Sequence, residues 1–133
     1  MQRLSFPCFF LFALFVSCNP GEVTKENKYL EKIIENQMNA GGGNFAAIGQ
    51  PAWTKVCFLG PYTGGSTASE VLGFSWNIES YSKISMYDDI TLIVFATDRK
   101  VVDFVEYPRN KHDFSGFSRK CYERSKAIMK IPE

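Results

Sequence analysis

Residues 90–107, ITLIVFATDRKVVDFVEY, decide the fold. Residues 90–97 form an almost continuous apolar run, which predicts a strand in the middle of a sheet. The polar triplet DRK supplies a turn, and residues 101–107 return as a second strand that Pro108 ends. The stretch therefore predicts an antiparallel hairpin around which the other elements are arranged.

Three further elements are predicted before the hairpin. Residues 53–59, WTKVCFL, contain the aromatic and β-branched side chains typical of a third strand. Ser66 or Thr67 can cap a short helix that runs through Leu72, and a glycine at position 73 ends it. Residues 74–78, FSWNI, alternate apolar and polar side chains, which favours another strand.

The chain after the hairpin allows two interpretations. A polar loop, residues 109–113, is followed by residues 114–129, whose apolar positions favour a helix. The last residues, AIMKIP from position 127, favour a final strand instead. The order of elements predicts an α+β fold, in which a small antiparallel sheet carries one or two helices packed on one face.

Four cysteines are divided between the N-terminal segment and the folded part. Cys8 and Cys18 belong to the N-terminal segment, which leaves Cys57 and Cys121 as partners. A bond between them would stabilise the fold by roughly 4 kcal/mol in the chain-entropy estimate. A metal site or a catalytic thiol is the alternative, but both need histidine partners and His112 is the only histidine. We therefore expect a structural disulfide.

The first residues are typical of a secretory signal peptide. Arg3 precedes an uncharged apolar run, residues 4–16, which is too short to cross a hydrocarbon core of about 30 Å. A short membrane anchor that stays attached is the alternative. We assign residues 1–17 to the signal peptide, residues 18–51 to a lipidated N-terminus and tether, and residues 52–133 to a disulfide-linked α+β domain.

The tether is expected to be flexible or partly helical. Residues 24–39 predict a short amphipathic helix, capped by Thr24, with apolar side chains at every third or fourth position. Three consecutive glycines follow at positions 41–43. They favour a mobile connection over a helix docked on the domain.

The segment Phe15-Val16-Ser17-Cys18 resembles the lipobox of bacterial lipoproteins. The resemblance implies that Cys18 is acylated and becomes the first residue of the mature chain, anchored in a membrane. Asn19, in place of aspartate, implies the outer membrane of the cell envelope, facing the periplasm. Ordinary cleavage, giving a secreted or periplasmic soluble protein, is the alternative.

Residues 65–73, GSTASEVLG, followed by a hairpin, also resemble small outer-membrane assembly lipoproteins of the SmpA/OmlA type. Those proteins have a glycine, a capped helix that contains valine, then Leu-Gly and a hairpin. In this chain the helix is several residues shorter and a strand precedes it, so no function is carried over.

Charge and aromatic content bear on partners. The 15 basic and 14 acidic side chains give a net charge of +1, which excludes the basic footprint of a nucleic-acid-binding protein. Acidic residues gather in residues 70–106 and basic residues in residues 109–130. The basic segment can dock an acidic partner or an anionic membrane, or pack beside the acidic region. The candidate binding surface comprises Tyr62, Arg109, Lys111 and His112.

Few patterns in the sequence point to catalysis. A hydrolase would have to use His112 with Asp88, Asp89 or Asp113. Residues 60–67, GPYTGGST, could hold an anion but lack the lysine of a phosphate loop. We expect a non-enzymatic, lipid-anchored envelope protein that binds a protein, as an inhibitor or immunity protein would, with no cofactor and no metal. An outer-membrane assembly or structural accessory is the first alternative, and the hydrolase is the second.

Overall fold

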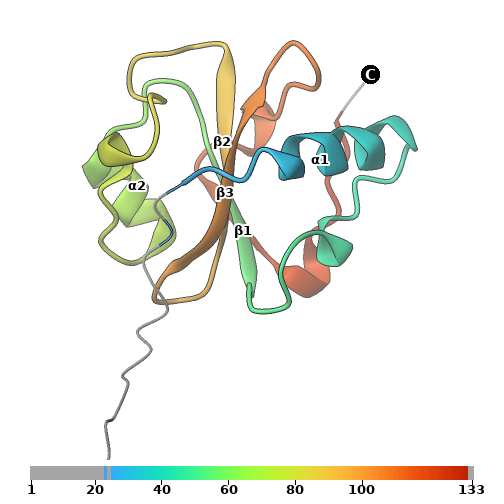
Figure 1. Ribbon diagram of the computed structural model, residues 1–133, viewed down its shortest axis with the longest axis horizontal. Coiled ribbons are helices and arrows are strands. Elements are labelled where there is room, and N and C mark those ends of the chain that lie inside the picture. The colour runs from blue at the N-terminus through green and yellow to red at the C-terminus, as the bar shows by residue number, and fades with distance from the viewer. Residues whose placement is uncertain (1–22, 24, 132–133) are drawn as a thin grey trace, which may run out of the picture.

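The computed structural model of the protein describes Val23 and residues 25–131, and shows an α+β fold (Figure 1). Its sheet has four antiparallel strands in the order β3-β2-β1-β4. The helices and strands are α1 (Tyr29–Asn39), β1 (Lys55–Leu59), α2 (Gly65–Leu72), β2 (Ile90–Ala96), β3 (Val101–Pro108) and β4 (Lys120–Glu123). The predicted hairpin, the strand before it and the short helix are all confirmed.

The two helices cover opposite faces of the sheet, with α1 on one side and α2 on the other (Figure 1). The expectation that the helices share one face is therefore wrong. Their placement explains the apolar runs, because side chains alternate between the faces of a strand and here both faces are buried. Every residue of β1 after Lys55, and of β2 after Ile90, is buried.

The core on the α1 face is rich in aromatic side chains. Phe58 of β1 and Phe95 of β2 project into it, and Phe45 packs against both, with ring centroids 5.9 and 6.3 Å away. Phe114, from the loop after β3, stacks on Phe58 at 5.5 Å. Each of these rings is completely buried. Large rings from distant parts of the chain thus fill this layer.

The core on the α2 face is aliphatic, with one aromatic cluster. Leu72 of α2 packs with alternate residues of β1 and β2, and Trp76 lies 5.4 Å from Phe104 of β3. Gly73 ends α2 in the left-handed conformation, with φ of 82°, as the sequence predicts. The turn that this glycine makes directs the following segment back over the sheet.

The predicted disulfide is confirmed. Cys57 of β1 and Cys121 of β4 are paired directly across the two strands, with Cα atoms 4.1 Å apart. β4 has only four residues and lies at an edge of the sheet. The covalent bond therefore supplements a short ladder of hydrogen bonds that has few residues to stabilise it.

Several secondary-structure predictions are wrong. The final strand expected from residue 127 is absent among the described residues, since only Ile128 forms an isolated bridge there, with Asn44. Neither Ser66 nor Thr67 caps α2, because the helix begins at Gly65 and Gly64 is its N-cap. Residues 114–129 form two single 3-10 turns on either side of β4 rather than a helix, because pairing with β1 satisfies the backbone there. Residues 74–78 alternate in polarity but do not form a strand. Their backbone is bonded locally, since the Trp76 amide donates to Ser69 Oγ and the Ile78 amide donates to the Trp76 carbonyl.

The predicted boundary at residue 52 also differs from the structure, since the domain includes α1. Leu30, Ile34, Phe45 and Ile48 are all at most 1% exposed. The glycines do not loosen this segment. Gly43 has φ of 47°, and a side chain there would overlap the carbonyl oxygen of Met129. Glycine is needed for close approach of two backbones. The signal peptide, Cys18 and Thr24 lie outside the described residues, but α1 begins at Tyr29 with Lys28 at its N-cap, so the prediction that Thr24 caps this helix is wrong.

Arg124 fastens the segment between α1 and β1 to the end of β4. Its guanidinium donates hydrogen bonds of 3.0–3.1 Å to the carbonyl oxygens of Ala46, Gln50, Pro51 and Trp53. The guanidinium carbon also lies 4.3 Å from the centroid of the Trp53 ring. Part of the basic C-terminal segment is thus used within the domain itself.

The docking of α1 can be tested with two adjacent isoleucines. Ile34→Ala removes a completely buried side chain, and we expect the free energy of unfolding to fall by about 2–5 kcal/mol. Ile33 is 42% exposed, so Ile33→Ala is the matched control, with a change within about 0.5 kcal/mol. Urea unfolding of both variants measures this. Equal small effects would mean that α1 is not part of the cooperative unit.

Candidate functional site

Three loops meet at one end of the sheet, where β1 ends and β2 begins. These are residues 60–64, 81–89 and 109–113, and together we call them the loop end. The Tyr62 amide donates to the Ile84 carbonyl at 2.8 Å, and the Arg109 amide donates to the Asp89 carbonyl at 2.9 Å. Backbone hydrogen bonds therefore join the middle loop to both of its neighbours.

Tyr62 is held outward by its backbone. It has φ of 61°, in the left-handed region that side chains with a Cβ rarely adopt, and its side chain is exposed, at 64%. The hydrogen bond to Ile84 holds the backbone of Tyr62 in this conformation. Strain of this kind, of order 1 kcal/mol, persists where the surrounding structure enforces it, and it is often found at functional sites.

Two further large side chains lie exposed in the neighbouring loop. Met86 is 71% exposed and Tyr87 is 43% exposed. With Tyr62 they form what we call the tyrosine patch. Sequence analysis missed Met86 and Tyr87, although their position in a polar stretch directly before an apolar strand was a usable signal. Asp88 and Asp89 follow at once and give the patch an acidic border.

Lys111, a predicted surface residue, is engaged by α1. Its Nζ lies 2.9 Å from an oxygen of Glu31 and 3.1 Å from an oxygen of Glu35. The hydrogen bond from Lys111 lowers the pKa of Glu35, and the two glutamates raise the pKa of Lys111. Its charge is therefore largely balanced within the domain.

Arg109 is likewise engaged by neighbouring groups. Its guanidinium binds both oxygens of Asp113 at 3.2 Å and the backbone carbonyl of Asp88 at 2.6 Å. Asp113 holds the pKa of this guanidinium above its ordinary value, and the arginine lowers the pKa of Asp113. This fork orders the loop after β3 against the loop that carries Met86 and Tyr87.

His112 lies against the core instead of facing a carboxylate. Its Nδ1 is hydrogen-bonded to the hydroxyl of Tyr107 at 2.7 Å, and the two rings stack with centroids 6.1 Å apart. Asp113, the adjacent acid, bonds to Arg109 and to the Ser115 amide. The structure therefore brings together His112 and a tyrosine, not the histidine and aspartate that general-base catalysis in the hydrolase hypothesis requires.

The glycine loop before α2 is closed by a carboxylate of the same chain. The Gly65 amide, in the first turn of the helix, donates to Oε1 of Glu79 at 3.2 Å. An anionic ligand would need this amide, which is already bonded.

Within residues 25–131, no three His, Cys, Asp or Glu side chains could hold a metal ion together. The helices of that same part of the chain are too short to span a bilayer.

Burial of Tyr107 makes stability sensitive to alkaline pH. Desolvation, with a smaller contribution from the charge of Glu35, raises the pKa of this phenol from 10.0 to about 12. Between these values the folded chain keeps a proton that the unfolded chain loses, so the free energy of unfolding falls as pH rises through this window. We expect Tyr107→Phe to flatten that dependence, and Tyr29→Phe, at an exposed tyrosine, to leave it unchanged. Urea unfolding across pH 9 to about 12 measures this, and identical slopes in all three proteins would contradict it.

The loop end thus presents an exposed aromatic patch whose supporting charges are satisfied internally. Such a surface offers area for contact with another molecule, and the histidine and the lysine of this end are both bonded to neighbouring side chains. Comparison of the chain with models of protein families, with curated proteins and with solved structures found no match.

Proposed function

We propose that the protein is a lipid-anchored, non-enzymatic protein of the bacterial cell envelope that binds another protein and acts as an inhibitor or immunity protein. The observation that carries the proposal is the tyrosine patch. Its side chains are large, exposed and mounted on loops that hydrogen bonds hold in place. Tyrosine and methionine are enriched at recognition surfaces, because they provide contact area with a polar tip or an adaptable shape.

Preorganisation favours binding by this patch. Fixed loops lose less conformational freedom when a partner docks, so more of the contact energy appears as affinity. The Arg109–Asp113 fork and the Tyr62–Ile84 hydrogen bond both limit movement at the loop end. An inhibitor or immunity protein has to occlude its target tightly, which a rigid patch on a cross-linked domain favours.

The position of Val23 supports anchoring at the opposite end. Val23 lines the same groove as Arg99 and Lys100 of the turn between β2 and β3, whereas the patch lies where β2 begins. The length of β2 separates these ends by about 20 Å. A lipid on Cys18 would therefore hold the domain by its hairpin end and direct the tyrosine patch away from the membrane.

Acylation is tested by labelling cells with palmitate. We expect label in the protein, its loss in Cys18→Ala and its retention in Cys8→Ala, because only Cys18 follows a complete apolar segment and a lipobox-like sequence. Electrophoresis and fluorography of the isolated protein measure the label. Cys8→Ala is the matched control for removal of a thiol, and equal labelling of both variants would exclude Cys18 as the acylated residue.

The binding role of the patch is tested with Tyr62→Asn. Asparagine tolerates the left-handed conformation, so we expect unchanged or slightly higher thermal stability together with loss of partner binding. Tyr29→Ala removes another highly exposed tyrosine, on α1, and should retain binding. Cross-linking in cells followed by quantitative mass spectrometry compares the three proteins.

The identity of the cross-linked protein then separates the candidate roles. A toxin or hydrolase that is lost in Tyr62→Asn and kept in Tyr29→Ala supports the inhibitor or immunity role. A component of an outer-membrane assembly machine with the same dependence would support the accessory role instead. A partner retained equally by both variants would contradict binding through the patch.

A further inference from the structure

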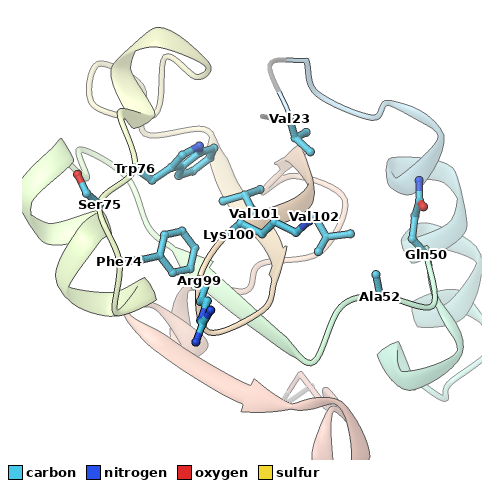
Figure 2. Close-up of a pocket in the computed structure, with 10 residues that line it drawn as sticks. All are labelled: Val23, Gln50, Ala52, Phe74, Ser75, Trp76, Arg99, Lys100, Val101 and Val102. Carbon is cyan, nitrogen blue, oxygen red and sulfur yellow. The ribbon is translucent and has the colours of Figure 1, made fainter. Parts of the chain in front are cut away.

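A groove of about 570 Å³ lies beside the turn between β2 and β3, and we call it the hairpin groove. Figure 2 shows the aromatic rings of Phe74 and Trp76 on one side and the valines of β3 at its centre. The opposite side is formed by Gln50 and Ala52, from the segment before β1, and Val23 lies over one end (Figure 2). The lining is therefore mainly apolar, although it reaches the protein surface.

Two cationic side chains border this apolar groove. Arg99 and Lys100, at the hairpin turn, both line it and are both exposed. Neither forms an ion pair with a described residue, and the adjacent acid, Asp98, pairs with Lys55 at 3.8 Å. These two cations thus differ from Arg109 and Lys111 at the loop end, whose charges are balanced by carboxylates.

The Trp76 ring on the wall of the groove has an unpaired polar atom. Trp76 is 4% exposed, and its indole nitrogen Nε1 has no hydrogen-bond partner among the described residues. This nitrogen is covered by protein atoms, so it offers no contact to a ligand in the groove. The hairpin groove therefore combines an apolar lining with two unbalanced cations.

The short connection between Cys18 and the groove determines how far the groove can lie from the membrane. Val23 follows Cys18 by five positions, so a fully extended chain places it within about 18 Å of the residue proposed to be acylated. On the proposed anchoring, the hairpin end is held at the membrane at high local concentration, where even a weak surface site is occupied. Arg99 and Lys100 would then lie at the level of lipid headgroups.

We infer that the hairpin groove is a docking surface for the anionic phospholipids of the membrane to which the protein is anchored. Arg99 and Lys100 bind headgroup phosphates, and the apolar side chains of Phe74 and the groove valines contact the glycerol and upper acyl region. This inference rests on the proposed anchoring. It adds a second attachment, which fixes the orientation of the domain and holds the tyrosine patch outward.

The test measures vesicle binding of the chain from Asn19 onward, without lipid, which retains every residue that the structure describes. Its co-sedimentation is compared between phosphatidylcholine vesicles and phosphatidylcholine vesicles containing phosphatidylglycerol, at low ionic strength. We expect binding that depends on phosphatidylglycerol. Arg99→Gln with Lys100→Gln should weaken it roughly 25-fold, from about five-fold for each basic side chain.

The chain offers a matched control for this pair. Arg119 and Lys120 are also adjacent, exposed and chemically identical to Arg99 and Lys100, but Lys120 pairs with Phe58 near the opposite end of β1. Arg119→Gln with Lys120→Gln changes the net charge equally and should leave vesicle binding unchanged. Equal weakening by both double variants would overturn the inference, because it would show attraction to the net charge alone.

Two further results of the vesicle experiment would count against docking on anionic phospholipids. Equal binding to both kinds of vesicle would overturn the inference. So would complete release by inorganic phosphate beyond the effect of sodium chloride at equal ionic strength, since this would indicate a site for free anions. The chain used carries no lipid and needs no protein partner, so its vesicle binding can fail while palmitate labelling of Cys18 and binding through Tyr62 succeed, and the reverse also holds.

Discussion

Burial of β1 and β2 on both faces is the constraint on which the structure depends. These strands have apolar side chains pointing in both directions, so one helix or one layer of loops cannot cover them. α1, Phe45 and Phe114 cover one face, while α2 and the segment containing Trp76 and Ile78 cover the other. The disulfide then links β4, the shortest strand and an edge of the sheet, to its neighbour β1.

The two ends of this sheet have different surface chemistry. At the loop end Arg109 pairs with Asp113 and Lys111 with two glutamates, and the exposed rings and thioether of the tyrosine patch have an acidic border. At the hairpin end Arg99 and Lys100 lack carboxylate partners among the described residues, and the groove that they border is mainly apolar. A domain of nearly zero net charge thus differs in surface chemistry between the two ends of its strands, as the proposed protein partner at one end and the inferred lipid surface at the other would require.

The elements predicted well from sequence are those that a short stretch of neighbouring residues is enough to identify. The apolar run of β2, the short helix ended by Gly73 and the two available cysteines can each be recognised without the rest of the fold. The docking of α1 depends on contacts between segments that are distant in the sequence. A glycine such as Gly43 is equally typical of a flexible hinge and of a close backbone contact, and only the fold shows the contact with Met129. Tyr62 was predicted as exposed, but its association with Met86 depends on loops that only the folded sheet brings together.

Pairing of β1 with β4 has a consequence for export. The first strand in the sequence is hydrogen-bonded to the last, and the backbone beside Gly43 is bonded to that of Met129. An emerging chain therefore lacks the partners of its own early segments until almost all of it has been synthesised, and contacts so distant in sequence form slowly. Such a topology delays stable folding, which would keep the chain extended during the export that the proposed envelope location requires and leave the disulfide to form after it.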